Sequence, residues 1–129
     1  MQSRILGTLL SVALAAPLVA GNKPKAPLLS VRATPRFALR APVNVLAMAE
    51  LQGGDDVEDF YCPALEWEWG DGSRSVQESD CAPFENGTEL ERRFSAEHVF
   101  RGSGTYNVKV TMRRVNRQLA AAAATVSIQ

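Results

Sequence analysis

The chain has 129 residues, enough for one domain with a modest core. Its 14 acidic and 14 basic residues give a formal net charge of zero, which argues against the concentrated basic face that nucleic-acid binding needs. All acidic residues lie from Glu50 to Glu97, and the charged residues of both flanks are all basic. We interpret this as a chain whose flanks neutralise its middle on folding. The alternative is an acidic rim that attracts cations or basic partners.

The first segment has the layout of a secretory signal peptide. Arg4 precedes an acid-free apolar run over residues 5–20, which is too short for a stable membrane span, and a polar stretch follows. We assign residues 1–21 to the signal peptide and 22–27 to a flexible leader, which leaves 28–129 as the folded domain. The prediction is a secreted or periplasmic protein with no membrane insertion after signal cleavage.

The folded part opens with strand patterns. Residues 28–32 and 37–40 predict two short edge strands broken by the proline between them, since proline is tolerated at sheet edges but not inside a ladder. Residues 43–51 alternate, and we assign their apolar odd positions to the core. This leaves Leu46 and Met48 pointing outward. Paired outward apolar side chains are either covered by the leader or form a contact surface.

An acidic loop over residues 52–59 is the candidate metal site. Four carboxylates occur within five residues, and these are the hard oxygen ligands that calcium takes in clusters. They are Asp55, Asp56, Glu58 and Asp59. Their spacing does not match a helix-loop-helix calcium loop, and a solvated acidic loop is the alternative. We hypothesise weak calcium binding here and expect no other cofactor.

Two tryptophans organise the centre of the chain. They belong to the stretch Trp67-Glu68-Trp69-Gly70-Asp71-Gly72. Two indoles at spacing two share one face of an extended segment, and we expect that face to be buried. We predict a central strand from Phe60 through the tryptophans, with an irregular start because Pro63 stands beside Cys62. A turn follows, in which Asp71 bonds back to the turn's amides. Residues 73–77 return as a short strand, and 78–89 form a long loop.

Cys62 and Cys81 are the only cysteines, and we predict a disulfide between them because export favours oxidation. Two thiols without histidines at ligand spacing cannot complete a tetrahedral metal site. The bond would close a loop of roughly 20 residues and contribute about 3 kcal/mol through loop-closure entropy. It would also pin the long loop to the strand of the tryptophans.

Three further strands complete the pattern. Residues 92–100 alternate, and residues 106–113 form the cleanest half-buried strand, with odd positions facing away from the core. After a hairpin turn at 114–117, residues 119–128 return as a strand, although their alanine run has helical propensity. About seven strands with turns between them predict an all-β sandwich. Tyr106, at the start of its strand, is placed as a tyrosine corner would be.

Catalysis is not expected from these residues. His98 is the only histidine and shares the apolar face of its strand, so we interpret it as a hydrogen-bonded structural residue. No nucleophile motif or glycine-rich phosphate loop is present in the sequence. Trp67 and Trp69 are interpreted as core residues and not as a platform for sugar stacking. A glycan site would instead use Tyr61, Phe84 and the loop around the second cysteine.

Three motifs together resemble the signatures of PKD (polycystic kidney disease) domains, which read W-x-F-G-D-G, H-x-Y and G-x-Y-x-V. In this chain they are Trp67-Glu68-Trp69-Gly70-Asp71-Gly72, His98-Val99-Phe100 and Gly104-Thr105-Tyr106-Asn107-Val108. The resemblance covers about residues 28–129. Trp69 and Phe100 replace the usual Phe and Tyr, and the cysteine pair and the long loop depart from the pattern. The resemblance implies an immunoglobulin-like sandwich that contacts proteins or glycans outside cells or in bacterial envelopes.

The combined prediction is an exported, disulfide-bonded, non-catalytic module. Its expected partner is an envelope or extracellular protein, contacted through Leu46 and Met48. Carbohydrate binding through Tyr61 and Phe84 is the alternative, and a calcium-stabilised structural spacer is a third reading.

Overall fold

The computed structural model describes residues 23–129 together with Gly7 and Ser11. Apart from these two positions, the predicted signal peptide, residues 1–21, lies outside the described residues. Within them, no helix has the length and apolar character needed to cross a membrane.

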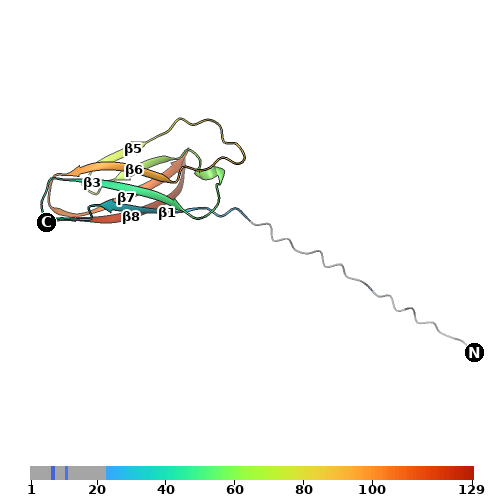
Figure 1. Ribbon diagram of the computed structural model, residues 1–129, viewed down its shortest axis with the longest axis horizontal. Coiled ribbons are helices and arrows are strands. Elements are labelled where there is room, and N and C mark those ends of the chain that lie inside the picture. Colours follow the sequence, from blue (N-terminus) through green and yellow to red (C-terminus); the bar gives the residue numbers. More distant parts are fainter. Residues whose placement is uncertain (1–6, 8–10, 12–22) are drawn as a thin grey trace, which may run out of the picture.

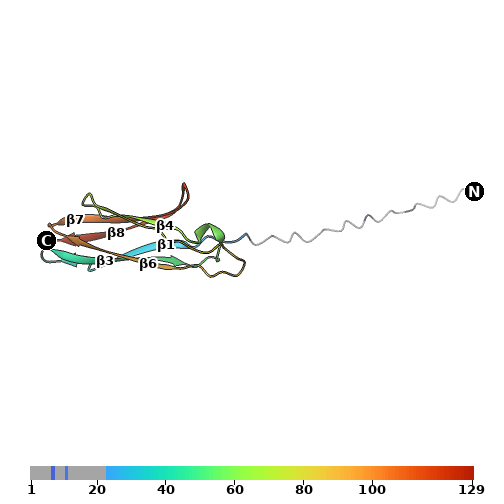
Figure 2. The same cartoon turned by 90° about the horizontal axis from the view of Figure 1, so that it is seen from above.

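The described chain folds into two sheets packed face to face, as Figures 1 and 2 show from two directions. A three-stranded sheet has the order β1-β3-β6, and a five-stranded sheet has the order β2-β8-β7-β4-β5. All pairings are antiparallel except β2 with β8. The predicted all-β sandwich is confirmed. The elements are β1 (Leu28–Thr34), β2 (Phe37–Ala38), β3 (Val43–Gln52), the 3-10 turn η1 (Glu58–Phe60), β4 (Ala64–Glu68), β5 (Arg74–Gln77), β6 (Arg93–Phe100), β7 (Gly104–Arg114) and β8 (Arg117–Ile128).

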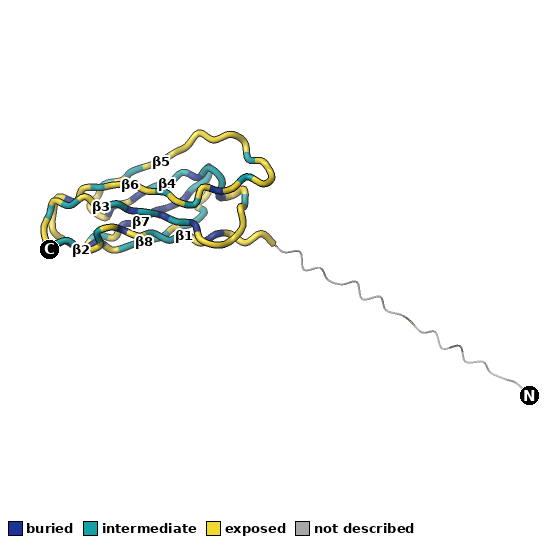
Figure 3. Tube along the Cα trace, viewed as in Figure 1, coloured by how far each residue is buried: buried dark blue, intermediate teal, exposed yellow. Residues whose placement is uncertain are grey.

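The core lies between the sheets and follows the alternation of the strands (Figure 3). On β3, Val45, Ala47 and Ala49 have no exposed surface, which confirms the odd face as the core face. Leu46 and Met48 lie on the opposite face and are half-buried. The alanine run of β8 pairs along β7 and every second alanine is half-buried, so ladder pairing overrides its helical propensity.

Both tryptophans are fully buried, as predicted. Their rings stack with centroids 5.7 Å apart. Each indole N–H donates to a side chain of β5: Trp67 to Gln77 Oε1 at 3.1 Å and Trp69 to Ser75 Oγ at 3.0 Å. Because a buried indole N–H needs an acceptor, these two bonds explain why polar side chains line this part of the short strand β5.

The central strand begins later than predicted. Phe60 belongs to η1, and β4 starts only at Ala64. Cys62 has a positive φ of 52°, and Pro63 follows it without an amide proton, so the chain cannot pair as a strand here. The interpretation of β7 also needs a correction, because Thr111 faces away from the core yet is only 4% exposed. It lies in an interior strand between Glu66 of β4 and Ala121 of β8, which cover it.

The predicted tyrosine corner is present. The Tyr106 hydroxyl donates to the backbone oxygen of Gly102 at 2.7 Å, four residues upstream. Its ring stacks on Phe100 with centroids 4.4 Å apart. The turn between β6 and β7 is therefore tied to the core by one aromatic side chain.

Candidate functional site

A polar cluster joins the two sheets at the turn between β4 and β5. His98 Nε2, on β6 of the three-stranded sheet, lies 2.6 Å from Asp71 Oδ2 in the turn of the five-stranded sheet. Ser73 Oγ lies 3.1 Å from the same histidine nitrogen, and the Ser73 amide donates to Asp71 Oδ1 at 3.0 Å. The His98 ring also stacks on Trp69, with centroids 4.7 Å apart. We call the three residues Asp71, Ser73 and His98 the latch, because their contacts join the two sheets.

This trio contains the residue types of a serine hydrolase, but its geometry differs from one. In a Ser-His-Asp relay, the serine and the aspartate contact opposite nitrogens of the imidazole. Here both contact Nε2, and the Ser73 hydroxyl also donates to Asp71. Both residues are hydrogen-bonded as predicted, and their purely structural role stays a prediction.

The latch lowers the pKa of Asp71 to about 2. Partial burial acts to raise this pKa, but hydrogen bonds from Ser73 and His98 stabilise the carboxylate and outweigh the burial. A carboxyl group whose pKa is lower in the folded state stabilises the fold above its unfolded pKa. This contribution is lost as the pH falls through the folded pKa.

We therefore expect the stability difference between the wild type and Asp71→Asn to depend on pH. At pH 5 the wild type should be more stable by about 1–2 kcal/mol, a value reduced for solvent screening of a partly exposed pair. The difference should shrink between pH 4 and pH 2, as Asp71 takes up its proton. Urea unfolding of both proteins across this range measures it. A constant difference would show that the Asp71 carboxylate does not hold the latch.

The four loop carboxylates do not converge. Each has its own basic or amide partner, and within the described residues no three potential metal ligands form a group that could hold an ion. Asp55 accepts from the Lys25 amide at 2.8 Å, Asp56 pairs with Arg92 at 3.0 Å, Glu58 lies 4.0 Å from Arg114, and Asp59 pairs with Arg117 at 2.9 Å. Calcium binding at this loop stays a prediction, without a preformed cluster to support it.

The aromatic pair considered for glycan binding instead braces the long loop. Tyr61 and Phe84 meet edge to face with centroids 5.3 Å apart, and the Tyr61 hydroxyl donates to the backbone oxygen of Ala82. Beside them, the predicted disulfide between Cys62 and Cys81 is formed, with a Cα–Cα distance of 6.1 Å. Both features fasten the loop to the segment before β4.

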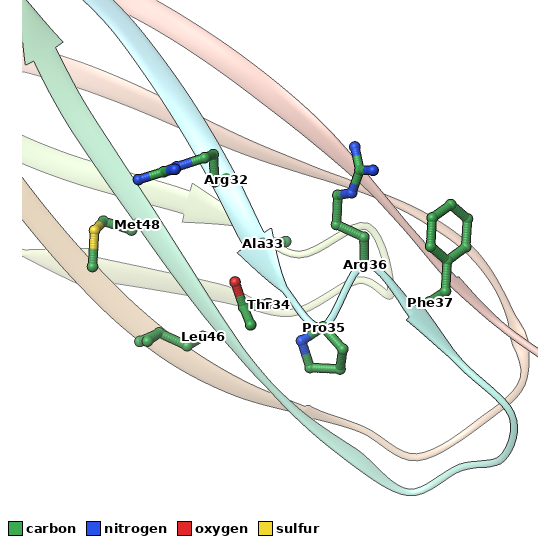
Figure 4. Close-up of a pocket in the computed structure, with 8 residues that line it drawn as sticks. All are labelled: Arg32, Ala33, Thr34, Pro35, Arg36, Phe37, Leu46 and Met48. Atoms are coloured by element: carbon green, nitrogen blue, oxygen red, sulfur yellow. The ribbon is translucent and has the colours of Figure 1, made fainter.

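Leu46 and Met48 border an open groove of about 630 Å³ on the outer face of the three-stranded sheet. In Figure 4 they lie next to each other on β3, with Arg32 of β1 nearby and Phe37 of β2 at the far side. Phe37 is 72% exposed. The sequence analysis did not identify Phe37 or Arg32 as surface residues of interest. The one indication in the sequence is that both lie in predicted edge strands that contain no acidic residue.

None of the described leader residues, 23–27, lines this groove. They follow the acidic loop instead, since the Asp55 amide donates to the Lys25 backbone oxygen at 2.8 Å. The described leader residues thus give no support to the reading in which the leader covers Leu46 and Met48, and the contact surface stays a prediction.

No family model and no curated protein sequence matches the chain. Among solved structures, the PKD domain of an M14-like peptidase from Thermoplasmatales archaeon SCGC AB-540-F20 is similar, with a TM-score of 0.55. The two share 15% sequence identity over 82% of this chain and 98% of that one. The fold is that of a PKD domain. The short motifs of the sequence thus indicated the right architecture.

The first glycine of the Trp67–Gly72 motif, Gly70, is required by its close approach to β7. Gly70 has φ +85°, and a Cβ there would lie 2.9 Å from the backbone N and O of Asn107 on β7. A side chain at this position would therefore clash with backbone as well as strain the turn. In this domain with a PKD fold, Gly70 lets the turn pass close to β7, so that Asp71 reaches His98.

Proposed function

We propose that this PKD-type domain is an exported, non-catalytic module that binds another protein of the cell envelope or the extracellular space. The observation that carries the proposal is the open groove beside Leu46 and Met48. It joins half-buried apolar side chains to the exposed ring of Phe37 on a face that no described segment covers. Apolar surface gathered in this way is typical of protein contact sites.

Two features support the extracellular setting. The disulfide between Cys62 and Cys81 is of a kind that persists in oxidising compartments, and the first residues of the sequence have a signal-peptide layout. The groove also offers aromatic and arginine side chains, which are enriched at protein interfaces. Together these features favour a protein partner outside the cytoplasm over a carbohydrate.

The test is affinity capture with the oxidised domain as bait for soluble envelope proteins. We expect Leu46→Asp or Met48→Asp to weaken retention of a specific partner at least tenfold, because a charge would be desolvated in the contact. The matched control is Val99→Asp, on the outer face of β6 in the same sheet and 42% exposed, which should retain the partner. Thermal unfolding of each variant should confirm that the fold is intact.

Two results would contradict the proposal. One is equal loss in the control and groove variants, which would remove the groove from the contact. The other is retention only on insoluble cell-wall glycan that survives protease treatment and is lost in Tyr61→Ala or Phe84→Ala. That result would support the carbohydrate-binding alternative.

A further inference from the structure

The loop between β5 and β6 is anchored on both sides of a short turn. Before the turn, Cys81 is held by the disulfide, and the half-buried Phe84 meets Tyr61 edge to face. After the turn, the side chain of Leu90 belongs to the core and is only 7% exposed. Residues 85–88 form the turn between these anchors. A change confined to this turn should therefore leave the sandwich intact.

Two hydrogen bonds close the turn. The Thr88 amide donates to the backbone oxygen of Glu85 at 3.0 Å, and the Glu85 amide donates to Thr88 Oγ1 at 3.3 Å. The first bond and the positive φ of Gly87, 89°, are typical of a type II turn. Glu85 and Gly87 are exposed, so water competes for these bonds and the turn can open without disturbing the core.

Asn86 and Gly87, the two central residues of the turn, place a nucleophile next to a reactive carbonyl group. Asn86 is exposed, and asparagine is among the thermolabile residues of proteins. The backbone N–H of Gly87 donates no hydrogen bond to any described residue. Apart from its chain neighbours, a Cβ at Gly87 would have nothing within 4 Å. Open space therefore surrounds this position, and no side chain of its own shields the nitrogen.

We propose that Asn86 is a site of spontaneous modification, at which the asparagine becomes aspartate or isoaspartate. The Gly87 nitrogen attacks Asn86 Cγ and forms a bond to it. The carboxamide nitrogen leaves as ammonia and takes up the proton that the Gly87 amide loses. Water then opens the cyclic imide at either carbonyl carbon. Opening at Cγ gives aspartate, whereas opening at the backbone carbonyl carbon gives isoaspartate, in which the chain runs through the former side chain.

Three other asparagines lie in the described part of the chain, and none of them combines these features. Asn44 and Asn107 lie within the ladders of β3 and β7, and each precedes a valine. Asn116 lies in the exposed hairpin turn between β7 and β8, but Arg117 follows it, and the long side chain of this residue shields the backbone nitrogen. Asn86 and Asn116 are therefore a matched pair within one molecule, since both lie in exposed turns and differ in the residue that follows.

The modification changes the charge of the loop. A new carboxylate joins Glu85 and Glu89, and isoaspartate also adds a carbon atom to the main chain of the turn. The protein should thus acquire more acidic forms with time. Asn86-Gly87-Thr88 also matches the acceptor pattern for N-linked glycans, but that reaction needs a transferase, whereas the cyclisation needs only water. The inference is independent of the contact function, and its failure would leave that function untouched.

The test is a time course of the oxidised protein at mildly alkaline pH, followed by reduction and peptide mapping by mass spectrometry. Trypsin releases residues 75–92 as one fragment, in which Asn86 is the only asparagine. We expect this fragment to gain the mass of an amide-to-carboxylate change and to separate into aspartate and isoaspartate forms. Ammonia should be released in equal amount. Conversion at Asn86 should be at least tenfold faster than at Asn116.

Three variants separate the chemistry from general effects on the fold. Gly87→Ala places a methyl group beside the attacking nitrogen and should slow the conversion at least tenfold. Gly53→Ala is the matched control, because Gly53 also has a positive φ and open space around its Cβ position. It should leave the rate at Asn86 unchanged. Thr88→Val removes the acceptor of the Glu85 amide and should speed the conversion by about two- to tenfold, as the turn opens more often.

Three outcomes would overturn the inference. One is equal conversion in Gly87→Ala and the wild type, which would show that the Gly87 nitrogen is not the nucleophile. Another is conversion at Asn116 as fast as at Asn86. The third comes from the same time course in urea: if the folded protein reacts more than tenfold slower than the unfolded chain, the folded turn protects Asn86.

Discussion

Replacing Trp69 by alanine is expected to destabilise the domain by about 3–5 kcal/mol, which lowers the melting temperature by roughly 15–25 °C. The indole is fully buried and stacks on Trp67 and His98. Truncation leaves a cavity between the sheets and removes the partner of the Ser75 hydroxyl. It also takes away the surface on which the His98 ring lies, so the latch to Asp71 should loosen as well.

Two controls separate these effects. Trp69→Phe keeps an aromatic ring and should cost only about 1–2 kcal/mol, from the lost hydrogen bond and reduced contact. Leu39→Ala, at a position that is 85% exposed, should change stability by less than about 0.5 kcal/mol. Equilibrium urea unfolding compares the three variants. If Trp69→Ala costs no more than Leu39→Ala, Trp69 is not the centre of the core.

The strand patterns were readable from the sequence because one face of each strand packs on the other sheet. On β3, alternation alone separates buried Val45 and Ala47 from outward Leu46. The alanine run needed a second argument, since its composition favours a helix and only the hairpin with β7 makes it a strand. The position of this segment directly after a hairpin turn was therefore a better guide to its structure than the helical propensity of alanine.

Local patterns failed where tertiary structure sets the backbone. The segment from Phe60 looked like the start of a strand, but it turns at η1, and the positive φ of Cys62 delays pairing until Ala64. The burial of Thr111 depends on neighbours supplied by two other strands. Pro63 signals the first feature in part, because it cannot donate to a ladder, whereas the second depends wholly on the neighbouring strands.

The sequence pointed to individual residues of the candidate sites but not to the contacts between them. Asp71 and His98 each suggested a structural role, yet their 2.6 Å contact exists only because β6 packs across the turn between β4 and β5. In the same way, Phe37 looked like the start of a short edge strand. Only the parallel pairing of β2 with β8 places it opposite Ser127 of the alanine strand.

Removing the disulfide is the second change with a large expected effect. The double variant Cys62→Ser and Cys81→Ser should lose about 3 kcal/mol of unfolding free energy, or roughly 12–20 °C in melting temperature. The bond joins residues 19 positions apart, and its loss releases loop-closure entropy in the unfolded chain. Urea unfolding of the oxidised wild type and the variant should show this loss, with a steeper denaturant dependence for the more expanded unfolded variant.

The long loop offers a way to separate this entropic effect from native contacts. Tyr61 and Phe84 hold the same loop in the folded state, so the fold of the serine variant should keep that loop in place. Phe84→Ala removes native contacts but leaves the crosslink, and its half-buried ring should cost only about 1–2 kcal/mol. Equal stability of the oxidised wild type and the serine variant would mean that the crosslink does not constrain the unfolded chain. Labelling of free thiols in the unreduced, denatured wild type should find none, and finding both would refute the bond itself.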